Sequence, residues 1–255
     1  MILEICTADI DSVGSAYSGG ADRIELCSAL EVGGITPSAG LLEQALWKSR
    51  RRMEPIAVNV LVRPRPGDFL YSDKELNQCV QDTAYAVGAG ADGIVFGALT
   101  SDGEVDDYAC EKVLDAMRQS LNPGQKVSTT FHRAFDLCRD PFVALEVIIK
   151  LGFDRILTSG QAASAEKGVE LLARLRERAA GRISIMPGGG ITPANIRQVI
   201  DATGVTEIHA SAKETVKSRM AFRREDVGMG ACDADEYSRF STSREIVREL
   251  KEKIG

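Results

Sequence analysis

The chain has 255 residues, 44% of them hydrophobic, which is enough to bury a large core in one eight-unit β/α barrel or in two smaller domains. Its formal net charge is -6 and its sequence pI is about 5.2. An acidic chain lacks the basic surface that supplies most of the affinity for nucleic acids and anionic membranes, so we expect neither as a partner.

The start of the chain and its cysteines indicate the compartment. Residues 2–6 already have strand character, which leaves no room for a secretory signal peptide, and no apolar run reaches the length of a transmembrane helix. Six cysteines are scattered without a C-x-x-C pair, unlike a secreted disulfide framework or a zinc ribbon. We therefore expect a cytoplasmic protein with reduced thiols.

Four short segments share a pattern in which a glycine ends a helix and a turn leads into a strand. Their strand isoleucines are Ile24, Ile94, Ile156 and Ile208. The intervals between them are too long for one βα unit and suit two, and intermediate strands are found at residues 2–6, 56–62, 127–131 and 183–186. Eight strands that alternate with helices predict a single (β/α)8 TIM-type barrel over residues 1–255.

Helices are expected between these strands. Asp140, Pro141 and Gly152 have the residue types that begin and end a helix, and Ser72 with Glu75 forms a capping box. Other helices are expected at residues 10–17, 36–48, 107–121, 165–179, from 192, and 244–254. One long connection, at about residues 212–243, follows the eighth strand, and we expect a loop there that acts as a lid or a contact surface.

Polar residues gather at the predicted C-terminal ends of the strands, where β/α barrels carry their chemistry. The catalytic candidates are Glu4, Glu25, Arg63, His132, Arg133 and His209. Either glutamate could act as a general acid or base, because burial beside a like charge raises the pKa of a carboxyl group. Two alternatives stay open: the glutamates pair with Arg63 and Arg133 in a buried ion network, and each histidine is a core side chain.

A glycine triplet follows the seventh strand and leads into a helix that begins at Thr192 and Pro193. Bare backbone N–H groups at a helix start form an anion site, and barrels often bind phosphate after this strand. The anion-binding candidates are Ser159, Gly160, Gly188, Gly189, Gly190 and Ser211. The alternative is that the triplet only forms a tight turn.

Several signatures are missing. No lysine lies at a predicted strand end, which argues against Schiff-base chemistry. The chain also has neither the G-x-G-x-x-G fingerprint of dinucleotide-binding folds nor the P-loop motif.

Cys6 and Cys27 lie on neighbouring predicted strands, two residues beyond Glu4 and Glu25 on the same face. Adjacent thiolates are soft ligands that suit Cu(I). Two sulfurs on one ion predict an S···S distance of roughly 4 to 5 Å, directly or after rotamer changes. The alternative is a pair of inert buried cysteines.

Six motifs, in order along nearly the whole chain, resemble those of the CutC copper homeostasis family. They are GGADRIELC at 19–27, GGITPS at 33–38, RPRPGDF at 63–69, FHRAFD at 131–136, LTSG at 157–160 and MPGGGI at 186–191. The resemblance implies a cytoplasmic β/α barrel, a homo-oligomer, and Cu(I) bound through Cys6 and Cys27. The chain departs from the family pattern at Pro66, where glycine is usual.

Two functions from different classes therefore remain. The first is a Cu(I)-binding copper homeostasis protein that uses Cys6 and Cys27. The second is a barrel enzyme that acts on a small anionic or phosphorylated molecule by acid/base chemistry. A metal buffer has no use for the arginines and the glycine loop, whereas an enzyme uses all of these groups.

Overall fold

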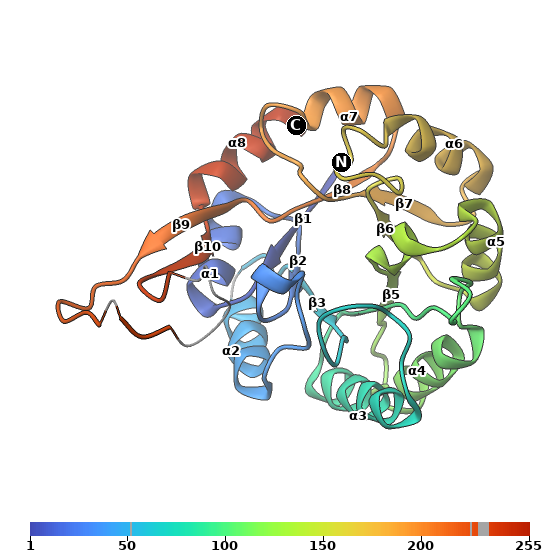
Figure 1. Ribbon diagram of the computed structural model, residues 1–255, viewed down its shortest axis with the longest axis horizontal. Coiled ribbons are helices and arrows are strands. Elements are labelled where there is room, and N and C mark those ends of the chain that lie inside the picture. The colour runs from blue at the N-terminus through green and yellow to red at the C-terminus, as the bar shows by residue number, and fades with distance from the viewer. Residues whose placement is uncertain (52, 225, 229–234) are drawn as a thin grey trace.

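The computed structural model of the chain describes residues 1–51, 53–224, 226–228 and 235–255. Its parallel strands are β1 (Ile2–Thr7), β2 (Arg23–Leu26), β3 (Ala57–Leu61), β4 (Gly93–Phe96), β5 (Ser128–Phe131), β6 (Arg155–Thr158), β7 (Ser184–Pro187) and β8 (Glu207–Ala210). They form one sheet in the order β7-β6-β5-β4-β3-β2-β1-β8. Its two ends, β7 and β8, lie side by side in Figure 1, so the sheet curls into the predicted TIM-type barrel.

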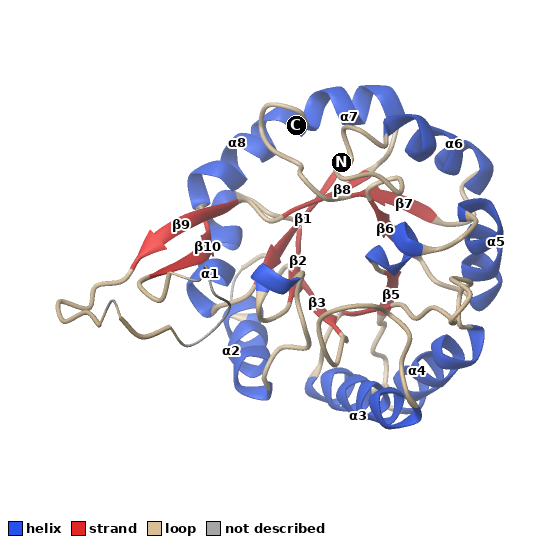
Figure 2. Cartoon of the chain, in the orientation of Figure 1, coloured by secondary structure: helices blue, strands red, loops and turns tan. Residues whose placement is uncertain are grey.

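The α-helices surround this barrel (Figure 2). They are α1 (Ile10–Gly19), α2 (Ala39–Arg50), α3 (Asp73–Ala89), α4 (Asp107–Gln119), α5 (Pro141–Leu151), α6 (Val169–Ala179), α7 (Ile196–Thr203) and α8 (Arg244–Ile254). Short 3-10 helices, η1 (Leu30–Val32) and η2 (Arg133–Leu137), follow β2 and β5. Among the residues that the structure describes, no helix has the length and apolarity needed to cross a membrane.

Local signals set the ends of several helices. The Asp140 side chain accepts the N–H groups at the start of α5, Pro141 is the first helical residue, and Gly152 ends the helix with φ 85°. Ser72 and Glu75 bond each other's backbone N–H groups at the start of α3. These predicted helix ends are confirmed.

Alternation along the strands separates two environments. In β1, Leu3 and Ile5 are fully buried and belong to the large apolar core between the sheet and the helices. Glu4 and Cys6 alternate with them and face the inside of the barrel, as expected of a period of two. A smaller apolar cluster of Cys6, Cys27, Leu61 and Val95 lies there. The barrel interior is therefore mostly polar below this cluster, and its outer wall is apolar.

The predicted loop at residues 212–243 contains two strands, so the expectation of an unstructured connection is wrong for them. The strands β9 (Lys213–Lys217) and β10 (Ser238–Thr242) pair in antiparallel fashion. They project beside α1 in Figure 1, and the Thr242 N–H donates to Ser12 Oγ at 3.0 Å. Such pairing between distant segments leaves no local sequence signal. Residues 225 and 229–234, with Cys232, lie outside the described ranges.

The helix after β6 begins later than predicted. It was expected from residue 165, but α6 begins at Val169. The Ala165 N–H instead donates to the carbonyl oxygen of Gly189 at 2.8 Å, which holds Ala165 in the loop. This bond ties the loop after β6 to the glycine loop after β7.

Candidate functional site

A cavity of about 510 Å³ opens at the C-terminal ends of the barrel strands. Its lining includes many of the predicted site residues: Cys6, Glu25, Arg63, His132, Arg133, Gly189, Gly190, His209 and Ser211. The volume is that of a small-molecule site. The structure therefore brings most of the residues singled out in the sequence to one place, with Glu4, Cys27, Ser159, Gly160 and Gly188 outside the lining.

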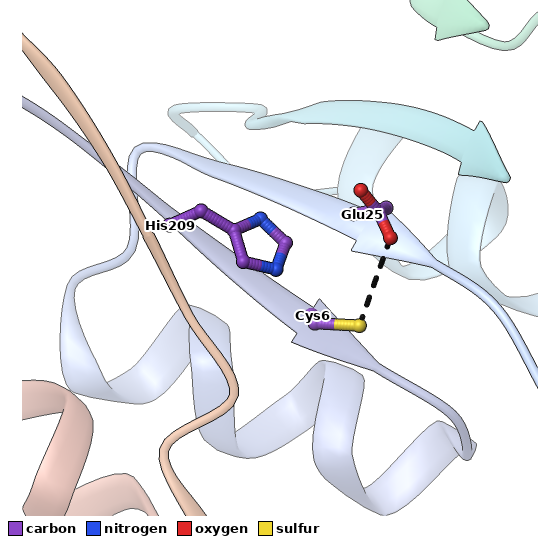
Figure 3. Close-up of side chains that lie close together, drawn as sticks. All are labelled: Cys6, Glu25 and His209. Atoms are coloured by element: carbon purple, nitrogen blue, oxygen red, sulfur yellow. Dashed lines mark hydrogen bonds between the residues drawn. The ribbon is translucent and has the colours of Figure 1, made fainter. Parts of the chain in front are cut away.

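Three buried side chains form a group with metal-ligand character at the base of this cavity. Ligand atoms of Cys6, Glu25 and His209 all lie within 4.8 Å of one another. Figure 3 shows the thiol, the carboxyl group and the imidazole pointing toward one another from neighbouring strands. The Cys6 Sγ lies 3.8 Å from Glu25 Oε1 and 3.5 Å from Cys27 Sγ. Together with Cys27, the group therefore offers two sulfurs, one nitrogen and one carboxylate oxygen.

Strand register explains this arrangement. Cys6 lies opposite Glu25 in the ladder between β1 and β2, and the Cys27 N–H continues the ladder by donating to the Thr7 carbonyl at 2.9 Å. Cys27 therefore lies two residues beyond the partner of Cys6 on the adjacent strand, and the two sulfurs lie 3.5 Å apart. This is the juxtaposition that parallel pairing of the two motifs requires.

The Cys6 thiol holds its proton in the metal-free protein. The hydrogen bond with Cys27, burial and the nearby Glu25 carboxyl raise the pKa of Cys6 well above its usual value. The Cys27 thiol donates to the carbonyl oxygen of Thr7 at 3.5 Å. The sulfur separation of 3.5 Å is shorter than the predicted roughly 4 to 5 Å, so an ion held between the sulfurs needs a rotamer change.

His209 is oriented by Glu4, which lies deeper in the barrel. The Nδ1 atom of His209 is 2.8 Å from Glu4 Oε1, which leaves Nε2 as the nitrogen for a metal. Burial alone would lower the pKa of His209, but hydrogen bonds to Cys6 and Glu4 and the charge of Glu25 raise it well above its usual value. The imidazole is therefore protonated without a metal, and a metal has to displace that proton.

The ion network of Glu4 differs from the one that the sequence predicted. Its carboxylate accepts from Arg23 Nε at 2.5 Å, and Arg23 also donates to Glu207 at 2.6 Å. Arg155 donates to the same Glu207 oxygen at 3.0 Å. Burial alone would raise the pKa of Glu4, but Arg23 and His209 lower it to about 2. Glu4 therefore lies below the cavity as a carboxylate held by Arg23 and His209, and its role as an acid or base stays a prediction.

The predicted pairing of Arg63 with a glutamate is also wrong. Its guanidinium donates to three loop carbonyl oxygens, those of Val32, Gly34 and Gly67, at 2.8 to 3.1 Å. Carbonyl groups at the ends of tight turns lack partners of their own, and a guanidinium has enough donors to bond several. Arg63 therefore fixes two loops at the cavity wall, including the loop that contains Pro66.

Glu25 and His132 have strongly shifted pKa values inside the cavity wall. Burial, with the nearby Glu4 carboxylate, raises the pKa of Glu25 to about 7. Burial, with the positive charge of Arg63, lowers the pKa of His132 to about 3. Within the described ranges, Glu25 Oε2 and His132 Nε2 are both buried without a hydrogen-bond partner. Buried polar atoms of this kind ordinarily bond an ordered water, an ion or a ligand.

The glycine loop and Arg133 form another part of the cavity lining. Gly189 has φ 97° and Gly190 has φ 73°, a region that disfavours other residues. A Cβ atom on Gly189 would lie 3.2 Å from the Arg133 guanidinium, so glycine allows the arginine to lie against the loop. Arg133 pairs with Asp136 at 2.7 Å and donates to Ser159 Oγ at 3.0 Å. This replaces its predicted pairing with a glutamate.

Three of the predicted anion-binding residues serve the loop itself. The Gly160 N–H donates to Thr158 Oγ1 and the Gly188 N–H to the Thr158 carbonyl, both at 2.9 Å. The Ser159 hydroxyl donates to the Ala162 carbonyl at 2.6 Å. These donors are used inside the protein, and anion binding by these three residues stays a prediction. In the part of the chain that the structure describes, the N–H groups of Gly189 and Gly190 have no such acceptor.

The sequence analysis missed two residues of this region. Arg23 is the central cation of the barrel, and its position two residues before Glu25 on β2 is the signal that could have found it. Lys213, just beyond β8, lines the cavity although no lysine was expected there. It is the first residue of β9, and its ammonium lies 4.3 Å from the centre of the Phe240 ring on β10.

Comparison with known proteins places this geometry in a family. The family model of the CutC family matches residues 1–214. A family protein CutC from Chromobacterium violaceum is 47% identical over 253 residues, which cover 99% of this chain and 98% of the relative. The human copper homeostasis protein cutC homolog is 46% identical over 250 residues, 98% of this chain and 87% of the relative.

Solved structures agree with these matches. A crystal structure titled as a copper homeostasis protein CutC, from Streptococcus agalactiae, has a TM-score of 0.76 and 33% identity, and covers 83% of this chain and 98% of its own. A thiamine phosphate pyrophosphorylase from Pyrococcus furiosus has a TM-score of 0.55 at 17% identity over 99% of this chain and 95% of its own, and this likeness shows the barrel fold alone. The chain therefore belongs to the CutC family.

Proposed function

We propose that this chain serves copper homeostasis by binding Cu(I) through Cys6 and Cys27, with His209 as a third ligand. The observation that carries the proposal is the 3.5 Å separation of the two buried sulfurs beside the imidazole. The names of the human and Streptococcus agalactiae relatives support it.

The donor set suits Cu(I) better than a hard cation. Two thiolates and an imidazole are soft or borderline ligands, whereas magnesium and calcium prefer several oxygens. Leu61 and Val95 pack against the sulfurs, so a bound ion would be shielded from water on that side. Binding has to release the protons of the Cys6 thiol and of His209, which couples affinity to pH.

X-ray absorption at the copper edge tests this proposal. Protein loaded with one equivalent of Cu(I) under reducing conditions should show two sulfur neighbours and one nitrogen neighbour. The His209→Phe variant should lose the nitrogen and keep both sulfurs. A spectrum with nitrogen and oxygen neighbours alone would contradict the proposal.

A second function is supported by the size of the cavity. A volume of about 510 Å³ is far more than one ion needs, and Arg133 and the free Gly189 and Gly190 amides line it away from the sulfurs. We propose as this second candidate an enzyme that holds a small anionic or phosphorylated molecule at these groups. Inorganic phosphate should shift the amide signals of both glycines, and Arg133→Gln should weaken binding. The exposed Arg139→Gln is the control.

A Cu(I) thiol site also requires a reducing compartment, because thiols and Cu(I) are both oxidised easily. We therefore propose a cytoplasmic location, which the free state of Cys6, Cys27, Cys79, Cys110 and Cys138 supports. Fractionation of the native host cells would test it.

We propose in addition that the chain forms a homo-oligomer through the region around the β9–β10 hairpin. Met220, Phe222 and Phe240 expose 60%, 69% and 42% of their surfaces there. Sedimentation velocity should show an oligomer that Phe222→Asp separates into monomers.

A further inference from the structure

His132 presents a hydrogen-bond donor that the folded chain does not use. Its Nδ1 accepts the N–H of Ala134 at 3.2 Å, so the proton of the neutral ring lies on Nε2. Within the described part of the chain, this Nε2 is buried and has no partner. The residue is 4% exposed and lines the cavity. A neutral imidazole N–H is therefore available to bond a ligand at the cavity wall.

The surroundings keep this ring neutral and in place. The rings of Phe69, Phe96 and Phe131 have their centres 4.9 to 6.4 Å from that of His132. An apolar cage of this kind disfavours the imidazolium, as does the nearby Arg63 charge. The ring therefore donates a hydrogen bond without adding a charge, which suits an uncharged oxygen such as that of a carbonyl group.

A second unused donor belongs to Arg63, whose charge acts on His132. Among the described residues, the Nε atom of Arg63 is buried without a partner, while its two terminal nitrogens bond loop carbonyls. These two N–H donors favour a group that accepts hydrogen bonds. Arg133 and the Gly189–Gly190 loop line the same cavity and add a positive charge and backbone N–H donors.

We propose that the cavity binds a small anionic carbonyl compound at two points: its charged group at Arg133 and the Gly189–Gly190 amides, and its carbonyl oxygen at His132 Nε2. This inference rests on the second candidate function and specifies its ligand class. It does not depend on copper, because neither contact involves Cys6 or Cys27.

Histidine NMR tests the His132 contact directly, because the chain has only two histidines. In metal-free, histidine-labelled protein at neutral pH, one ring should show the neutral tautomer with hydrogen on Nε2 and the other, His209, an imidazolium. His132→Phe assigns the signals. Finding hydrogen on Nδ1 of His132, or a charged ring, would overturn the proposal.

The ligand class is tested by titration with dihydroxyacetone phosphate, which has an uncharged ketone, and, as the matched probe without a carbonyl oxygen, inorganic phosphate. Dihydroxyacetone phosphate should shift the His132 Nε2–H signal and the Gly189 and Gly190 amides along one saturation curve. Phosphate should shift the glycine amides alone. If both probes leave His132 unchanged while the glycines respond, the anion site stands and this proposal fails. If neither probe shifts the glycines at millimolar concentration, the second candidate function fails as well.

Variants separate recognition from folding. His132→Phe keeps the ring packing but removes the donor, and should weaken binding of dihydroxyacetone phosphate about ten-fold, the effect of one lost hydrogen bond. His132→Gln restores an N–H near the Nε2 position and should recover most of this affinity. Phosphate binding should stay the same in both variants, which shows that the cavity is folded. Equal affinity for dihydroxyacetone phosphate in native protein and His132→Phe would contradict the proposal.

Discussion

The Nδ1 atom of His209 lies 2.8 Å from Glu4 Oε1, and the other Glu4 oxygen accepts from Arg23 at 2.5 Å. The candidate metal ligand is therefore oriented by a carboxylate that the buried ion network holds in place. Such outer partners commonly alter metal affinity 10- to 100-fold when they are changed. The interior charges of the barrel and the site at its mouth form one connected structure.

The first prediction concerns stability. Glu4→Gln leaves the buried Arg23 without its nearest counter-charge, so the free energy of unfolding should fall by about 3 kcal/mol or more. Urea unfolding measures the change. Glu146→Gln, which removes an exposed ion pair with Arg182, should have a much smaller effect. Equal losses in the two variants would show that the interior network does not stabilise the fold.

The second prediction concerns pH. The pKa of Glu25 is raised from 4.5 to about 7, so the folded state keeps a proton that the unfolded chain loses. Stability from this group is complete below pH 4.5 and is lost as pH rises to about 7. Glu25→Gln mimics the protonated form and should abolish this loss, which is on the order of 3 kcal/mol. Parallel stability curves for native and variant protein between these pH values would refute it.

Much of the fold follows from signals that act over a few residues. The capping side chains of Ser72 and Asp140 and the glycine at 152 set helix ends through bonds to neighbouring backbone groups. The alternation of apolar and polar residues along β1 distinguishes its outer and inner faces. These signals do not depend on distant residues, so the order of strands and helices could be predicted from the sequence.

The parts that could not be predicted depend on pairing between distant residues. Glu4 meets Arg23 because the β1–β2 register puts them opposite each other, and residue types alone did not favour Arg23 over Arg63. The β9–β10 pair joins segments about twenty residues apart. A Cβ atom on Gly160 would lie 2.5 Å from the carbonyl oxygen of Gly168. Close packing between these two loop segments therefore explains the glycine at 160 better than anion binding does.

The third prediction concerns His209 as a metal ligand. His209→Phe should lower Cu(I) affinity by about 10- to 100-fold, because it removes one donor and leaves both sulfurs. His132→Phe is the matched control, since it changes the other histidine of the cavity outside the metal group. Chelator competition measures both variants. An unchanged affinity in His209→Phe would restrict the site to the two thiols.

The fourth prediction concerns the pH dependence of copper binding. The raised pKa values of Cys6 and His209 mean that these groups are protonated in the metal-free protein at neutral pH. Cu(I) competes with those protons, so affinity should increase by about ten-fold per pH unit for each proton displaced. Competition titrations at several pH values between 6 and 8 give the slope. An affinity that does not change with pH would mean that the ion does not bind at these groups.

The thiol pair is tested most directly by Cu(I) affinity, measured by chelator competition under reducing conditions. The measurement compares the native chain with two double variants, Cys6→Ser/Cys27→Ser and Cys79→Ser/Cys110→Ser. The second variant is a matched control, because all four cysteines are free and buried. The first variant should lose at least about 100-fold in affinity, since serine hydroxyls are poor ligands for a soft cation. The second should bind as the native protein does. Equal affinity in all three would contradict Cu(I) binding at Cys6 and Cys27.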